Sequence, residues 1–179
     1  MATTRLYTEE DLWQMDAGSR FYIIGGELFE DVSAPISSGV AAYINGCLFI
    51  HIRPRMLGRL YGADGAYVLR QNPDTVLIPD LSFVRADRVP PRDEQIKFFR
   101  FPPDLAVEVL SPSNRRVDID RKIAIYREAG VPLVWLVDPF KQTVEIFTPT
   151  AERTLTVADT LDGGNVLPGF RLPLAELFA

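Results

Sequence analysis

Two short segments that are apolar on both faces most constrain how this chain can fold. They are residues 105–110 (LAVEVL) and 133–137 (LVWLV), and a strand that is apolar on both sides must be covered on both sides. Residues 115–129 between them have the length of a helical crossover that ends at Gly130, and such a connection joins parallel strands. The sequence therefore predicts an α+β fold in layers, with a mixed sheet between helices.

The rest of the chain supplies further predicted elements. On the N-terminal side we expect a helix over 8–16 that ends before Gly18, a β-hairpin of 21–24 and 28–32 around Gly25-Gly26, and a helix from 40 to 52. Next come antiparallel strands at 60–69 and 76–84, and a loop at 87–103 that could move over a site. The C-terminal part predicts a strand at 144–147, an edge strand at 154–157 and a short helix after Pro173.

Composition excludes several classes of protein. With 179 residues, of which 47% are hydrophobic, residues 1–179 are expected to form one domain with its own core. No run of about 18 apolar residues marks a membrane span, and the polar N-terminus does not resemble a signal peptide, so a cytoplasmic location is expected. One cysteine and one histidine cannot form a zinc cluster. Any metal site must therefore be built from oxygen ligands.

The charge balance weighs against nonspecific attraction to nucleic acid. The formal net charge is −5 and the pI is about 4.9, but the basic residues are unevenly distributed. Three clusters stand out: Arg53, Arg55 and Arg59; Arg85, Arg88 and Arg92; and Arg115, Arg116, Arg121 and Lys122. Each cluster either contacts phosphates locally or is ordinary solvated charge.

Glu108 is the most informative charged residue. Within 105–110 it shares a face with Ala106 and Leu110, which predicts that its carboxylate is buried among apolar side chains. Burial of an unpaired carboxylate is costly. Glu108 therefore needs a cationic side chain, a metal ion or a raised pKa.

Asp80 is the second candidate site residue. It lies in the predicted strand 76–84 directly after Pro79, whose missing N–H favours an edge or a bulge that re-aims side chains. If this strand is next to the one that carries Glu108, the two carboxylates can bind one hard cation such as Mg²⁺. The backbone carbonyl of Val109 could then be a third ligand.

Lys122 is the third candidate. The apolar stripe of helix 115–129 runs through Ile119, Ile123 and Tyr126, and Lys122 lies beside it. A lysine there either extends to water or meets a carboxylate. A cluster with the two acidic residues would satisfy all three charges.

Each candidate also has an ordinary structural interpretation. Asp80 after a proline is typical of a turn or strand end, Glu108 could pair with an arginine, and Lys122 could extend along the surface. Glu27 is a further candidate acidic ligand, but it follows a hairpin turn, where side chains are commonly exposed.

Several motifs together carry a family resemblance. They are IPDLSFV at 78–84, PDLAVEVLSPS at 103–113, residues 122–126, Gly130-Val131, WLVDP at 135–139, LPGF at 167–170 and LPL at 172–174. This combination resembles the PD-(D/E)XK nuclease superfamily, and more specifically the bacterial Uma-type restriction endonucleases. In the simple superfamily pattern a lysine follows the acid by two residues. That position is Leu110 here, so the resemblance assigns the lysine role to Lys122.

The resemblance implies a restriction-endonuclease-like fold, DNA as substrate, Mg²⁺ or Mn²⁺ as cofactor, and a homodimer. Asp80 and Glu108 would hold the metal ion, and Lys122 would orient or deprotonate the attacking water. Members often carry a histidine near the start of the long first helix, where this chain has Ser37, Ser38 and Gly39. Two alternatives stay open: a non-catalytic protein of the same fold that binds nucleic acid or protein, and a hydrolase of small phosphoesters with a closed pocket.

Overall fold

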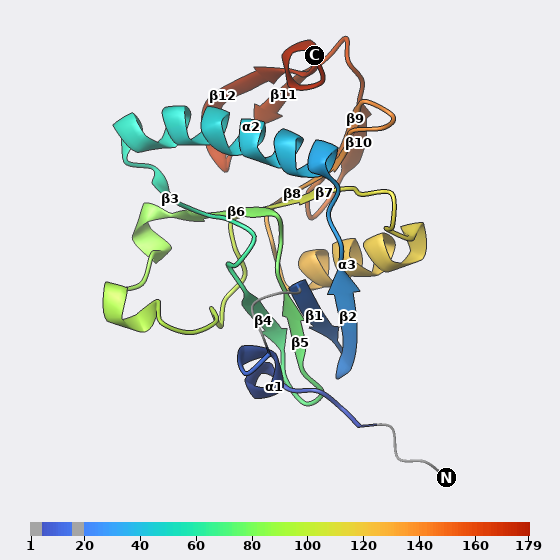
Figure 1. Ribbon diagram of the computed structural model, residues 1–179. Helices are drawn as coiled ribbons and strands as arrows, with labels where there is room; N and C mark the ends of the chain where they lie inside the picture. Colours follow the sequence, from blue (N-terminus) through green and yellow to red (C-terminus); the bar gives the residue numbers. More distant parts are fainter. Residues whose placement is uncertain (1–4, 16–19) are drawn as a thin grey trace.

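A six-stranded mixed sheet forms the centre of the structure, a computed structural model that describes residues 5–15 and 20–179 (Figure 1). Its strand order is β10-β9-β8-β7-β6-β3. The strands are β3 (Gly58–Tyr61), β6 (Leu81–Arg85), β7 (Leu105–Val109), β8 (Leu133–Asp138), β9 (Thr143–Phe147) and β10 (Glu152–Leu155). β7 and β8 run parallel, and the other neighbouring strands in this sheet pair antiparallel.

Helices cover both faces of this sheet, as its apolar strands require. Helix α3 (Arg116–Glu128) connects β7 to β8, so the predicted crossover and parallel pair are confirmed. It packs against the face of β7 that carries Ala106, while α2 (Pro35–Ile52) packs against the face that carries Val107. Figure 1 shows the two helices on opposite sides of the sheet. The predicted α+β layering is thus correct.

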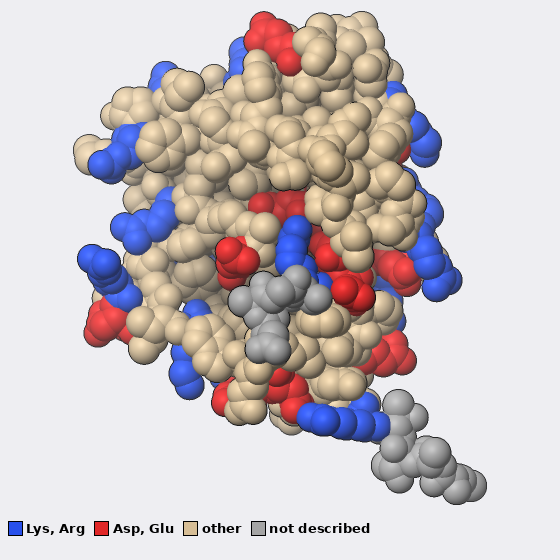
Figure 2. Space-filling model, viewed as in Figure 1, with Lys and Arg blue, Asp and Glu red and all other residues tan. Residues whose placement is uncertain are grey.

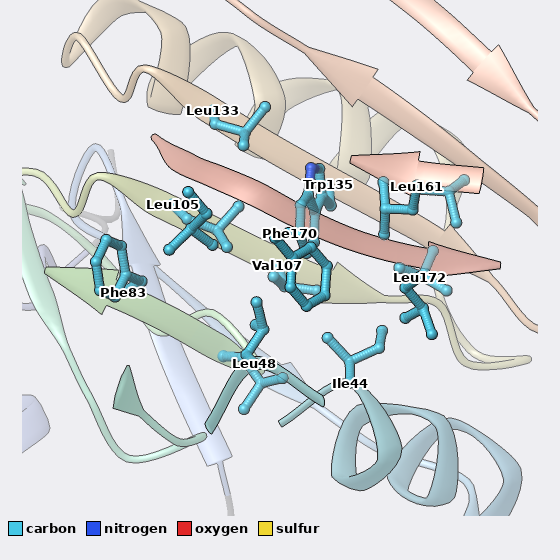
Figure 3. Packing of buried hydrophobic residues seen from close by; sticks show 14 of the residues in the cluster. Ile44, Leu48, Phe83, Leu105, Val107, Leu133, Trp135, Leu161, Phe170 and Leu172 are labelled. Carbon is cyan, nitrogen blue, oxygen red and sulfur yellow. The ribbon is translucent and has the colours of Figure 1, made fainter. Parts of the chain in front are cut away.

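The larger core lies between α2, the six-stranded sheet and a C-terminal two-stranded sheet (Figure 3). That small sheet consists of β11 (Thr160–Gly163) and β12 (Leu167–Pro173), and α4 (Leu174–Leu177) follows it. Phe170 of β12 stacks on Trp135 of β8, with ring centroids 5.7 Å apart. The C-terminal helix was predicted. β11 and β12 were not, because glycines and prolines interrupt the alternation that marks a strand, and their register shifts at Asp162/Gly163.

A second, four-stranded sheet has the order β2-β1-β5-β4. Its strands are β1 (Arg20–Ile24), β2 (Glu27–Asp31), β4 (Tyr67–Arg70) and β5 (Thr75–Leu77). The predicted hairpin of β1 and β2 is confirmed. Gly25 and Gly26 have φ of 59° and 81°, the left-handed values that this two-residue turn requires.

The strands predicted at 60–69 and 76–84 are each broken into two. Their antiparallel pairing is correct, but β3 and β6 belong to the large sheet, whereas β4 and β5 belong to the smaller one. Between β3 and β4 the chain turns, and the Gly65 N–H donates to the Gly62 carbonyl. Between β5 and β6, Pro79 has no N–H to continue a ladder. Asp80 therefore lies between β5 and β6, and not within a strand as predicted.

The remaining boundaries differ modestly from the predictions. Helix α1 (Glu9–Trp13) has Thr8 as its N-cap in a capping box; residues 16–18, where this helix was predicted to end, lie outside the described residues. Helix α2 starts at Pro35, five residues earlier than predicted, and a 3₁₀ turn at Arg53–Arg55 follows it. Segment 87–103 is a loop with 3₁₀ turns at Ala86–Arg88 and Arg92–Glu94, and β10 is an edge strand as predicted.

Candidate functional site

Glu108 and Lys122 form a buried ion pair beneath α3. Glu108 on β7 is 3% exposed and Lys122 on α3 is 2% exposed. The Nζ atom of Lys122 lies 3.1 Å from Oε2 of Glu108, and the hydroxyl of Tyr126 donates to Oε1 at 2.7 Å. Because α3 follows β7 directly and crosses over it, residues one helical turn apart, 122 and 126, both reach the same carboxylate.

The environment shifts the pKa values of both partners. Burial raises the pKa of Glu108; the Lys122 ammonium opposes this shift and the negative charge of Asp80 adds to it, so that the pKa stays above its ordinary value. For Lys122, burial alone would lower the pKa, but the carboxylates of Glu108 and Asp31 outweigh it and raise the pKa. Lys122 is therefore an ammonium in this state.

Asp80 is tied to the same strand through the backbone. Its Oδ2 accepts a hydrogen bond from the N–H of Val109 at 2.7 Å, and its Oδ1 accepts one from Nη1 of Arg20 at 3.1 Å. The pairing of β6 with β7 extends to Leu81 opposite Val107, so the carboxylate of Asp80 occupies the next ladder position. Val109 thus contacts Asp80 through its amide. The predicted role of its carbonyl as a metal ligand stays a prediction.

Two residues of the hairpin join these contacts into one network. Arg20 and Asp31 lie opposite each other on β1 and β2, and Nη2 of Arg20 is 3.6 Å from Oδ2 of Asp31. The same Oδ2 lies 3.9 Å from Nζ of Lys122. Asp31 therefore links Arg20, which contacts Asp80, to Lys122, which contacts Glu108.

This network, which we call the carboxylate cluster, has a net negative formal charge. Among the described residues it contains three carboxylates and two cations: Asp31, Asp80, Glu108, Arg20 and Lys122. The ring of Tyr22 adds an apolar wall, with Nζ of Lys122 4.2 Å from its centroid. Figure 2 shows acidic and basic side chains gathered below the α2 layer.

The sequence prediction missed Arg20, Asp31 and the hydroxyl of Tyr126. A signal for the first two was present, because a two-residue Gly-Gly turn fixes the hairpin register and so places Arg20 opposite Asp31. Tyr126 was assigned to the apolar stripe, and its position one turn after Lys122 could have identified it as a partner of Glu108.

The structure does not bring Glu27 into the carboxylate cluster. It lies at the other end of β2 from Asp31, and four residues of extended strand span roughly 13 Å. Its carboxylate pairs with Arg121 at 3.2 Å on the surface. Glu27 is therefore a surface ion-pair partner in this state.

The donor set of the cluster fits a hydrated Mg²⁺ ion. Among the described residues there is no group of three acidic, histidine or cysteine side chains arranged to hold a metal ion. Mg²⁺ does not need such a group, because it commonly keeps several waters and binds through one or two carboxylates. Asp80 and Glu108 are hard oxygen donors, and each carboxylate can accept more bonds than it makes here.

The comparison with protein families assigns the chain. The model of the Uma2 family, described as "Putative restriction endonuclease", matches residues 8–175. The chain belongs to the Uma2 family. The match covers all the elements that build the carboxylate cluster, from β1 to α3.

A solved structure has the same fold as this Uma2 chain. It is the crystal structure of a "putative nuclease belonging to DUF820" from Anabaena variabilis ATCC 29413. The TM-score is 0.84, the sequences are 18% identical, and the match covers 96% of this chain and 97% of that one. The predicted fold is thus confirmed. A comparison with curated proteins gave no match.

Proposed function

We propose that this Uma2 protein is a metal-dependent endonuclease that hydrolyses phosphodiester bonds in DNA. The observation that carries the proposal is that Asp80 accepts a hydrogen bond from the N–H of Val109, the residue after Glu108, while Lys122 lies 3.1 Å from Glu108. Membership of a family described as "Putative restriction endonuclease" supports the same activity. Mg²⁺ or Mn²⁺ is the proposed cofactor, and a homodimer in the cytoplasm is the proposed working form.

The side chains of the cluster would divide the work. Asp80 and Glu108 would hold the cation, which when bound polarises the scissile phosphate and lowers the pKa of a coordinated water. Lys122 is an ammonium because nearby carboxylates raise its pKa. It is therefore suited to orienting the attacking water and neutralising negative charge, and less suited to accepting a proton. Arg20 and Tyr126 would keep the two carboxylates in place.

Only part of the basic surface is free to contact phosphates. Arg85 and Arg88 are paired with Asp87 and Asp104, and Arg116 is paired with Asp120 and Glu145. By contrast, Arg55 and Arg59 donate to neutral oxygens, the carbonyl of His51 and the side chain of Gln95. The cluster of Arg53, Arg55 and Arg59 after α2 is therefore the best candidate for phosphate contacts.

Salt dependence of DNA binding tests this assignment. Replacing Arg53, Arg55 and Arg59 by glutamine should reduce the slope of log affinity against log salt by about 2–3. The triple variant Arg85→Gln, Arg88→Gln, Arg116→Gln is the matched control, and it should change the slope less. An equal effect of both triple variants would contradict the assignment.

Cleavage assays test the activity itself. We expect the wild type to cleave plasmid or single-stranded DNA when Mg²⁺ or Mn²⁺ is present, and Glu108→Gln to lose at least about 100-fold in rate. Glu128→Gln, an exposed change on α3, should leave the rate unchanged. Equal cleavage by wild type and Glu108→Gln would place the activity elsewhere or in a contaminant.

One observation favours a second candidate, a non-catalytic binding module with the same fold. The carboxylates of Asp80 and Glu108 are already paired with Arg20 and Lys122, which can replace a metal ion structurally. Calorimetry with Mn²⁺ separates the two: a nuclease should bind the ion and lose binding in Asp80→Asn, whereas a binding module should show no Mn²⁺ binding in either protein.

A further inference from the structure

Helix α2 has a solvent-facing side that is apolar and free of charge. Its 18 residues, Pro35–Ile52, include no Asp, Glu, Lys or Arg. Its buried side consists of Ser37, Ile44, Leu48 and Ile52. Large apolar side chains are exposed on the rest of its surface: Ile36 at 50%, Tyr43 at 43% and Ile50 at 74% lie along one line, and Phe49 at 55% lies to one side of that line. Figure 2 shows a broad area without charged residues in the upper half of the molecule, where α2 lies in Figure 1.

Three of these four exposed residues follow a heptad spacing. Ile36, Tyr43 and Ile50 are seven residues apart, and Gly39 and Gly46 each lie three residues after one of them. A Cβ atom added at Gly39 or Gly46 would meet no atom within 4 Å. Packing inside this chain therefore does not require glycine at these positions, and each glycine leaves a notch beside a large side chain.

We propose that α2 packs against α2 of a second copy of this chain across a two-fold axis. Large side chains at 36, 43 and 50 of one copy would enter the notches at Gly39 and Gly46 of the other. A face that alternates large and small residues is self-complementary, which a two-fold interface requires. This proposal specifies the surface of the homodimer proposed above, and it does not depend on nuclease activity.

The charge and size of the face both favour a second copy as the occupant. Each chain carries a net charge of −5, so two copies approach with least repulsion through a face that has no charge. The four large side chains of α2 present about 440 Å² if each offers roughly 200 Å² when fully exposed. The small residues between them add to this area, and a stable interface buries roughly 800 Å² per partner.

A membrane is a weaker candidate for the same face. Residues 35–55 are long and apolar enough to span a bilayer by length and composition alone. However, Ile44, Leu48 and Ile52 pack into the main core, so α2 is fixed as a layer of the fold. Helices that lie on a membrane surface are usually rich in Lys and Arg along their polar side, and α2 has neither.

Molar mass in solution, measured by light scattering or sedimentation, tests the proposal. We expect a dimer for the wild type and for Ile96→Glu, and a monomer for Ile50→Glu; Ile50 and Ile96 are 74% and 69% exposed. Gly46→Gln should also give a monomer, because its side chain fills the notch without meeting any atom of its own chain. If circular dichroism shows that Ile50→Glu is unfolded, the result for Gly46→Gln decides the question.

Two results would overturn the proposal: a monomeric wild type, and a dimer that both α2 variants leave intact. If the wild type is monomeric and binds anionic phospholipid vesicles, and Ile50→Glu abolishes that binding, the face is a membrane-binding surface instead. Mn²⁺ calorimetry on the same variants keeps the two proposals apart. Monomeric Ile50→Glu should still bind Mn²⁺ if the nuclease proposal holds. A wild-type dimer that binds no Mn²⁺ would contradict the nuclease proposal and leave the dimer proposal intact.

Discussion

The carboxylate of Asp80 accepts a hydrogen bond from the N–H of Val109 at 2.7 Å, at the ladder position just before β6 begins. The side chain of Asp80 thus accepts a hydrogen bond that a backbone carbonyl would accept if β6 were longer. The contact holds Asp80 beside the residue that follows Glu108, so the two acidic groups are positioned by one strand end. Asp80 has both a structural and a chemical role in this arrangement, and substitutions can separate the two.

Asp80→Asn and Asp80→Ala should differ in stability but not in metal binding. Asparagine keeps an oxygen that can accept the Val109 N–H, whereas alanine leaves that donor without a partner, at a cost of about 1–3 kcal/mol. Both variants lose the charge that would hold a metal ion. We expect urea denaturation to distinguish them and Mn²⁺ calorimetry to show weak or no binding in both. Equal stability of the two variants would argue against the structural role.

Lys122→Met should destabilise the fold more than the double variant Lys122→Met, Glu108→Gln. The single change leaves a buried carboxylate without its cation, for which about 3 kcal/mol is expected. The double change removes the charge of both partners. Free energies of unfolding from urea titrations measure the difference. A single variant as stable as the wild type would show that the ion pair between Lys122 and Glu108 does not stabilise the fold.

Tyr126→Phe should shift the pH dependence of metal binding. Burial raises the pKa of Glu108, while the hydrogen bond from Tyr126 lowers it. A metal ion needs the ionised carboxylate, so affinity should fall as the pH is lowered through this raised pKa. Without the hydroxyl the pKa of Glu108 rises further, and the fall should begin at a higher pH. The check is Mn²⁺ calorimetry at several pH values; an unchanged profile would mean that Glu108 does not control binding.

Arg20→Gln should increase the affinity for Mn²⁺ several-fold. The guanidinium donates to Oδ1 of Asp80 at 3.1 Å, and its positive charge lies where it opposes a second cation. Glutamine removes the charge and keeps a side chain that can donate a hydrogen bond. Arg121→Gln, at the other end of the hairpin, is the matched control. A weaker affinity in Arg20→Gln would show that Arg20 is needed to position Asp80.

The sequence was most informative where one segment determines its own partners. The unit 105–137 contains two strands and the helix between them, and its polarity pattern predicted both the parallel pairing and the burial of Glu108. The contact between Glu108 and Lys122 follows from the same unit, because a crossover helix packs on the strand that precedes it.

Contacts between distant segments were not predictable in the same way. Arg20 lies 60 residues before Asp80, and periodicity within either segment does not indicate that they meet. The break at Pro79 had a local signal, but the transfer of the chain from one sheet to another depends on the pairing of β4 with β5 and of β3 with β6. Whether Asp80, Glu108 and Lys122 act as a catalytic site stays a prediction.

A crystal structure of the protein soaked in Mn²⁺ tests the central claim most directly. We predict an anomalous difference peak between the carboxylates of Asp80 and Glu108, within coordination distance of an oxygen of each. A peak that contacts neither residue, or no peak here at a Mn²⁺ concentration that supports DNA cleavage, would contradict the account.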